Sequence, residues 1–139
     1  MEPQETRSPS QIIPVLVAAL VCDVAVADPS TGKKNLIGIF DRITVSKFPT
    51  QRRMSIYVKL ADAEGFYKIE IRYVQVPSGK ILATAVGDFE IRDRLQASDF
   101  FLSLPPLLIP EKGRYEFQVW ANDVFLGATF IDAISPISA

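Results

Sequence analysis

Three charged residues lie inside otherwise apolar segments and are the first candidates for chemistry. Asp23 interrupts the apolar run of residues 12–27, and the adjacent pair Asp41 and Arg42 interrupts a second run, residues 36–45. A buried charge is tolerated only when an opposite charge or hydrogen bonds compensate it. The sequence therefore predicts a buried polar cluster of Asp23, Asp41 and Arg42, which is either a structural ion pair or a ligand-binding site.

The chain of 139 residues contains no histidine. This excludes Ser-His-Asp and Cys-His nucleophiles and histidine-ligated zinc. Glycine-rich nucleotide-binding loops, CxxC and EF-hand spacings are also missing from the sequence. We therefore predict no catalytic residue, no cofactor and no metal. A histidine-independent hydrolase would need two carboxylates, and no spacing singles out a pair among Glu64, Glu70, Asp88, Glu90, Asp93 and Asp99.

Two clusters and one aromatic residue are candidate contact surfaces. Lys47, Arg52 and Arg53 flank Phe48 and form a basic patch suited to an acidic partner. A second, apolar segment is flanked by prolines, which remove ladder donors and exclude a regular central strand. The single tryptophan is the candidate platform for a carbohydrate. The predicted interface residues are Phe48, Arg52, Arg53, Leu107, Leu108 and Trp120.

Composition and charge are those of an ordinary globular domain. Hydrophobic residues make up 48% of the chain, charged residues 22%, and the net charge is -1. Such a weak field recruits neither nucleic acid nor an anionic membrane. We therefore expect neither of these partners, and expect instead a protein partner or a homodimer formed through strand edges. The single cysteine, Cys22, cannot form an internal disulfide and indicates a cytoplasmic location.

The first apolar run also resembles a secretory signal, because Ala25-Val26-Ala27 imitates a cleavage site. The preceding residues oppose export, since Glu2 and Glu5 outnumber Arg7 where a signal needs net positive charge. A membrane span would need about 20 apolar residues, more than this run supplies. Its valines favour a strand buried on both faces or nearly so. Secretion remains the alternative to a core strand.

Period-two alternation dominates the rest of the chain and indicates strands with one buried face. The first two apolar runs, joined by the polar turn of residues 28–34, predict a hairpin. Only residues 92–97 remain as a candidate short helix. The sequence predicts an all-β antiparallel sandwich of about eight strands with little helix. We expect one domain at residues 12–134, a flexible N-terminal tail at 1–11 and a C-terminal tail at 135–139.

One local motif is similar to the corner of immunoglobulin-like sandwiches. Gly113 and Tyr115 have the spacing of that corner, where the tyrosine bonds to backbone, and Phe117 stands where antibody domains place a disulfide cysteine. More widely, residues 19–23, 36–43 (LIGIFDRI), 47–49 and 113–115 resemble a family of small bacterial proteins known as a domain of unknown function. The resemblance covers about residues 13–133. It implies a bacterial, stand-alone β-sandwich and carries no catalytic residue.

The function expected from the sequence is therefore that of a non-enzymatic protein-interaction or assembly module. Two alternatives stay open. One is a carbohydrate-binding or small-ligand-binding module, and the other is a hydrolase that uses carboxylates without histidine.

Overall fold

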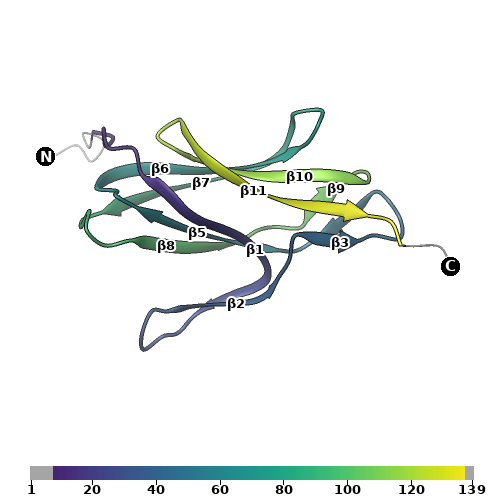
Figure 1. The fold of residues 1–139 in the computed structure, drawn as a ribbon, viewed down its shortest axis with the longest axis horizontal. Helices are drawn as coiled ribbons and strands as arrows, with labels where there is room; N and C mark the ends of the chain where they lie inside the picture. Colours follow the sequence, from purple (N-terminus) through teal and green to yellow (C-terminus); the bar gives the residue numbers. More distant parts are fainter. Residues whose placement is uncertain (1–7, 137–139) are drawn as a thin grey trace, which may run out of the picture.

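The computed structural model describes residues 8–136 and shows two β-sheets packed face to face (Figure 1). The predicted all-β sandwich is confirmed, and residues 8–136 contain no helix that could cross a membrane. The described chain has eleven strands, where about eight were expected. The difference comes from three strands of only three residues each, too short to leave an alternation pattern. These are β3 (Arg42–Thr44), β4 (Thr50–Arg52) and β9 (Leu107–Ile109).

The first sheet has four strands in the order β2-β1-β5-β8, and every neighbouring pair is antiparallel. β2 and β8 are its edges. The predicted hairpin between the first two strands is confirmed, with Ala27 opposite Lys34 at its tip and Cys22 opposite Ile39 at its base. The bounds are β1 (Val15–Ala27), β2 (Lys34–Ile39), β5 (Ser55–Ala61) and β8 (Ser98–Ser103).

The second sheet has five strands in the order β3-β11-β10-β6-β7. Its pairs are antiparallel except β3 and β11, which run parallel. Residues 36–45 therefore do not form one strand as expected, because the chain leaves the first sheet after Ile39 and enters the second at Arg42. The bounds are β6 (Gly65–Gln75), β7 (Lys80–Ile91), β10 (Gly113–Ala121) and β11 (Val124–Ile134).

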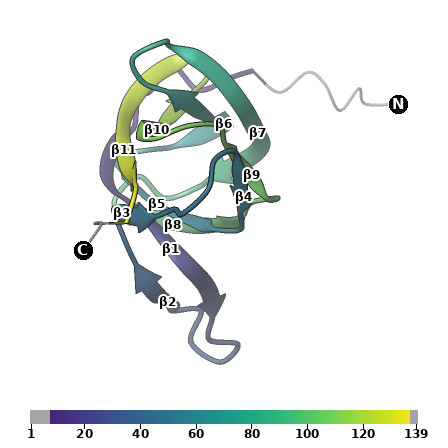
Figure 2. The same ribbon diagram turned by 90° about the vertical axis from the view of Figure 1, so that its right-hand side faces the viewer.

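A third ladder pairs β4 with β9 at one end of the sandwich, which Figure 2 shows most directly. Leu107 to Ile109 were expected to form no regular central strand, and they form a short antiparallel strand outside the two main sheets. Prolines at 105, 106 and 110 confine it to three residues, since proline has no backbone N–H to donate.

The core lies between the two main sheets and follows the predicted alternation. On β10, Tyr115, Phe117 and Val119 are fully buried. On β5, Ile56 and Val58 face them from the first sheet and are also fully buried. Full burial of a side chain of this size stabilises the fold by roughly 1.5–3 kcal/mol. This core holds the two sheets together without any disulfide among the described residues.

The predicted tyrosine corner is confirmed. The Tyr115 hydroxyl donates a hydrogen bond to the Glu111 carbonyl and accepts one from the Glu111 N–H at 3.1 Å. Its ring stacks on Tyr73, with 5.6 Å between the ring centroids. Phe117 packs beside Tyr73 and occupies by apolar burial the place of a disulfide cysteine.

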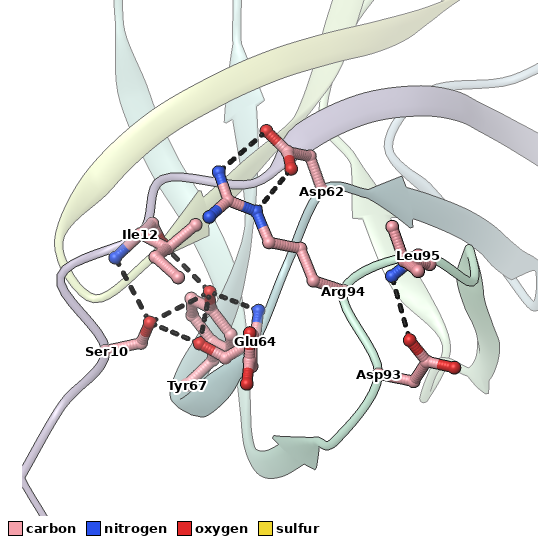
Figure 3. Close-up of polar contacts among 8 residues, drawn as sticks. All are labelled: Ser10, Ile12, Asp62, Glu64, Tyr67, Asp93, Arg94 and Leu95. Atoms are coloured by element: carbon pink, nitrogen blue, oxygen red, sulfur yellow. Dashed lines mark hydrogen bonds and ion pairs between the residues drawn. The ribbon is translucent and has the colours of Figure 1, made fainter.

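The N-terminal segment corrects the predicted flexible tail over part of its length. Pro9 forms a parallel bridge with Phe66, and the Ser10 N–H donates to the Phe66 carbonyl at 3.0 Å. Tyr67 donates from its hydroxyl to the Ile12 carbonyl at 2.9 Å (Figure 3). Residues 8–11 are therefore fastened to the start of β6. The remainder of both predicted tails, residues 1–7 and 137–139, lies outside the described residues.

The expected short helix at residues 92–97 is wrong. Asp93 accepts a hydrogen bond from the Leu95 N–H through its side chain, at 2.9 Å, and forms a turn instead (Figure 3). Such side-chain bonds to the local backbone compete with helix formation. Arg94 leaves this turn to pair with Asp62.

Candidate functional site

The second half of β1, the following turn and β2 form a hairpin that we call the arm, residues 23–39. In both views the arm lies below β5 and β8 and outside the sandwich (Figures 1 and 2). Lys34 ties it to β8 through an ion pair with Asp99 of 2.8 Å. Burial disfavours the charge on Asp99, but its bonds to Lys34 and Tyr57 prevail and lower the pKa of the carboxyl. The arm is thus attached to the sandwich at a defined point.

The tip of the arm is a closed turn. Asp28 accepts hydrogen bonds through its side chain from the N–H groups of Ser30 at 2.8 Å and Thr31 at 3.3 Å. Its own N–H donates to the Lys33 carbonyl at 2.8 Å. The bonds from Ser30 and Thr31 lower the pKa of the Asp28 carboxyl. These contacts set the register in which β2 returns along β1.

The two sides of the arm differ in burial. Ala25 and Leu36 are paired across it, and Ala25 is buried. Val24 and Ile37 are paired on the other side and are 48% and 58% exposed. The expectation of a core strand buried on both faces is therefore wrong. In β1 only Val21, Cys22 and Ala25 are buried, Val15 and Val17 are more than half exposed, and the strand leaves the sandwich at Asp23. We call the exposed side the arm patch; it consists of Val24, Val26, Ile37 and Ile39.

β2 is an edge strand, so its outer side is not paired with another strand of the described chain. Natural proteins usually protect such edges with charges, proline or a covering loop. β2 contains no proline and a single charged residue, Lys34, which forms an ion pair with Asp99. The arm therefore presents both free backbone groups and apolar side chains.

The predicted buried polar cluster is wrong as a cluster. Asp23, Asp41 and Arg42 are all exposed, because the chain crosses between the sheets on the outside of the sandwich. Asp23 pairs with Arg52 at 3.2 Å instead of with Arg42. Arg42 lies opposite Asp132 in the parallel ladder, and its charge adds to that of Arg114 in lowering the Asp132 pKa.

The predicted interface residues are distributed around the base of the arm and beyond it. Arg52 lies over the Phe40 ring, 5.0 Å from its centroid, while also bonding to Asp23. Phe48 is half-buried against the core, and Arg53 is exposed. Leu107 is buried between the sheets and is unavailable to a partner, which corrects its assignment, whereas Leu108 is exposed.

A shallow hollow of ≈ 330 Å³ adjoins the arm where β1 passes β11. Leu20 and Ile39 line one side, Thr129 and Phe130 the other, and Phe40 lies between them in the chain crossing. The exposed apolar surface thus continues from the arm onto the side of the sandwich.

Trp120 lies far from the arm, on the outer face of the five-stranded sheet. Arg72 covers one face of the indole at 4.0 Å, and Phe125 meets the ring edge-on at 5.4 Å. Arg72 also pairs with Glu70. The same arrangement recurs where Arg114 lies 3.7 Å over the Phe130 ring and pairs with Asp132. We call the outer face of the five-stranded sheet, with Trp120 and Phe130 on it, the paired face.

A polar cluster that the sequence did not reveal fastens the N-terminal segment. The Ser10 hydroxyl, which has one proton to donate, lies within hydrogen-bond distance of the Glu64 carbonyl and of the Tyr67 hydroxyl, the latter at 3.0 Å (Figure 3). Asn122 donates to the Ser10 and Phe66 carbonyls. Every group is satisfied, which is typical of a structural fastening. The only signal in the sequence was Gly65, since a side chain there would overlap Ser10.

Several titratable groups among the described residues have shifted pKa values. Burial raises the pKa of Tyr57 to about 12, with its bond to Asp99 adding to the effect, and burial also raises the pKa values of Cys22, Tyr73 and Tyr115. Hydrogen bonds within two ion pairs lower the pKa values of Asp62 and Asp132 and raise those of their partners Arg94 and Arg114. Each of these shifts moves away from neutrality. Residues 8–136 also hold no group of three or more side chains suited to a metal ion.

Two of the solved structures that resemble this chain are distant likenesses. A Pseudomonas aeruginosa immunoglobulin-like protein has a TM-score of 0.39 at 12% identity, and the match covers 91% of this chain and 94% of that one. A Pseudomonas fluorescens alkylpurine DNA glycosylase, solved with DNA containing an abasic site analogue, has a TM-score of 0.45 at 16% identity. That match covers 67% of this chain but only 27% of the glycosylase.

No curated protein matches the sequence. A family of unknown function, DUF6941, matches residues 17–133 and therefore most of both sheets. The predicted membership in an uncharacterised family is confirmed, and this chain belongs to the family of unknown function DUF6941.

Proposed function

We propose that this chain is a non-enzymatic protein-interaction domain and that the arm is its contact surface. The observation that carries the proposal is the arm patch, four neighbouring uncharged side chains that are between 45% and 58% exposed. Exposed apolar residues scattered singly are normal, but a contiguous group on a projecting hairpin is typical of a contact site.

The mechanism we propose is strand addition. The outer edge of β2 offers backbone N–H and carbonyl groups to an incoming strand, which would supply affinity. Side chains of that strand would cover Ile37 and Ile39, which supplies selectivity. A second copy of the chain is the simplest partner, because an uncharged patch does not repel its own copy across a twofold axis.

One further observation supports a role without catalysis, and another supports a reducing compartment. The pKa shifts described above leave Tyr57 protonated and Asp99 and Asp132 ionised at neutral pH, so these groups do not exchange protons with a substrate. Cys22 is fully buried with a raised pKa, which keeps its thiol unreactive and agrees with a cytoplasmic location.

The proposal is tested by placing a photo-cross-linking amino acid at Ile37 or, as a control, at Val86. Val86 lies on the outer side of β7 and is also 58% exposed, so the two positions differ in surroundings and not in accessibility. We expect a discrete protein adduct from position 37 alone. An adduct of twice the mass of the chain from purified protein would identify a second copy.

A second variant guards against chance contact. Ile39→Lys places a charge beside the cross-linker and should remove the adduct formed from position 37 while leaving the unfolding midpoint near that of the parent. Equal adduct yields at positions 37 and 86, or an adduct that survives Ile39→Lys, would contradict the assignment of the arm.

A further inference from the structure

A second hollow, of ≈ 400 Å³, lies between the end of β3 and β4, on the side of Arg52 away from the arm. Its size falls in the range of about 300–1,000 Å³ that is usual for small-ligand pockets. The residues that matter for its chemistry are Thr44, Ser46, Lys47, Thr50, Gln51 and Arg52.

The charge of this segment is one-sided. Residues 42–53 contain four cationic side chains, Arg42, Lys47, Arg52 and Arg53, and no acidic one, although the whole chain has a net charge of -1. No aspartate or glutamate lines the hollow. The ammonium of Lys47 forms no ion pair with any residue between 8 and 136, so its charge is uncompensated within the described chain.

The second cation of the hollow is held in place from outside it. Arg52 donates to Asp23 at 3.2 Å and lies over the Phe40 ring at 5.0 Å. A guanidinium held in this way needs little further ordering to bind a ligand, although Asp23 competes for its charge. Arg52 is therefore positioned in advance but partly neutralised.

Apart from the apolar Val45 and Ile109, the remaining lining residues are donors of the kind that bind oxyanions. Thr44, Ser46 and Thr50 each carry a hydroxyl whose proton can turn toward an anion, and Gln51 carries an amide N–H. None of these four side chains makes a hydrogen bond within the described chain. Hydrogen bonds from such groups and from cations to an ionised oxygen are stronger than those between neutral groups.

We propose that the hollow between β3 and β4 binds an oxyanion, the carboxylate or phosphate group of a small ligand, with Lys47 and Arg52 as its cations. The site is separate from the arm patch, and its occupation does not depend on strand addition at β2. The proposal therefore assigns a carboxylate or phosphate ligand to the basic patch that the sequence indicated.

The test is a titration of the purified full chain, followed by the backbone amide signals in nuclear magnetic resonance. Inorganic phosphate and sodium acetate are added separately at constant ionic strength, with sodium chloride as the reference. We expect saturable shifts confined to residues 44–52, and the stronger of the two ions identifies the phosphate or the carboxylate source. Shifts spread over all exposed lysines, or none with either ion, would overturn the proposal.

Two variants assign the cations. Lys47→Gln should raise the apparent dissociation constant by about fivefold, the effect of removing one charged partner. Lys112→Gln, on an exposed loop elsewhere, should leave it unchanged. Asp23→Asn should lower the dissociation constant about twofold, because it frees the charge of Arg52. Equal effects of the two lysine variants would overturn the site, and weaker binding in Asp23→Asn would overturn the role of Arg52.

Discussion

The paired face and the arm patch both expose apolar side chains, and they differ in what covers them. On the paired face two rings have an arginine above them, Arg72 over Trp120 at 4.0 Å and Arg114 over Phe130 at 3.7 Å. Each of these arginines is also bonded to a carboxylate of the same sheet. On the arm, Val24 and Ile37 lie beside each other with no charged residue across from either.

The difference follows from the chemistry of the side chains. An aromatic ring has a negative face that attracts a guanidinium, so a solvated strand can cover its own aromatic residues with charge. A branched aliphatic side chain has no such face, and only another apolar surface can cover it. Trp120 and Phe130 are therefore partly covered by arginines of their own sheet, whereas we propose that a partner covers the arm patch.

The largest effect is expected where the arm leaves the sandwich. Gly38 has a φ of 71°, and a side chain at this position would overlap the Asp23 carboxylate. Gly38→Ala should cost about 2 kcal/mol or more, of which roughly 1–2 kcal/mol is the cost of the left-handed backbone. The rest arises because Asp23 must turn away and release Arg52. Urea denaturation measures the loss.

The matched control is Gly79→Ala in the β6–β7 turn of the other sheet. Gly79 has a φ of 75°, but a Cβ at this position would have no atom within 4 Å. Gly79→Ala should therefore lose only the free energy of the left-handed backbone. Equal losses of unfolding free energy in the two variants would show that crowding between residue 38 and Asp23 does not affect stability.

A smaller effect is expected from uncovering a ring on the paired face. Arg72→Ala removes the cation over Trp120 and the ion pair with Glu70, and should cost about 1 kcal/mol of unfolding free energy. Arg92 likewise pairs with a glutamate two residues earlier, Glu90, but its side chain is 84% exposed and covers no ring among residues 8–136. Arg92→Ala should therefore be nearly neutral. A red shift of Trp120 fluorescence in the folded state accompanies only Arg72→Ala, and identical behaviour of both variants would refute the covering role.

The smallest effect concerns acid. The pKa of Asp132 is lowered by Arg114 on the paired face, and that of Asp99 is lowered by Lys34 and Tyr57, against its burial, at the arm. A carboxyl with a lowered folded-state pKa stabilises the fold at neutral pH. This contribution falls once the pH drops below the unfolded pKa of about 4 and is lost as the pH passes the folded value.

Asp99→Asn and Asp132→Asn should each reduce stability by about 0.5 kcal/mol at pH 7, as expected for half-exposed ion pairs. Each variant should then lose less stability than the parent between pH 7 and pH 3, measured by urea denaturation at both values. Asp88→Asn, which breaks no ion pair among residues 8–136, serves as the control. An unchanged acid response in both test variants would contradict these assignments.

Much of the fold was predictable because period-two alternation reports burial directly. The inward residues of β10 and the hydrogen bond made by Tyr115 followed from spacing alone. The exposure of the arm did not, because a run of valines and alanines looks the same in a buried strand and in a projecting one. Asp23 marked the point where β1 leaves the sandwich, but its meaning depends on Gly38 and Arg52, which are distant in sequence.

The candidate sites were predictable only in part. The basic segment around Lys47 was visible as charge, whereas the hollow that gives it shape forms where β3 and β4 meet. Leu107 and Leu108 are adjacent and chemically identical, yet one is buried and the other exposed. Only the pairing of β9 with β4 decides which side chain points inward.

The sequence by itself determined the all-β class, the single core and the absence of histidine chemistry, because alternation and residue type are local properties of the chain. The tertiary structure alone decided which apolar residues remain exposed, which charges pair and where the hollows lie. These depend on strand order and on the bend of β1, which bring together residues far apart in the chain.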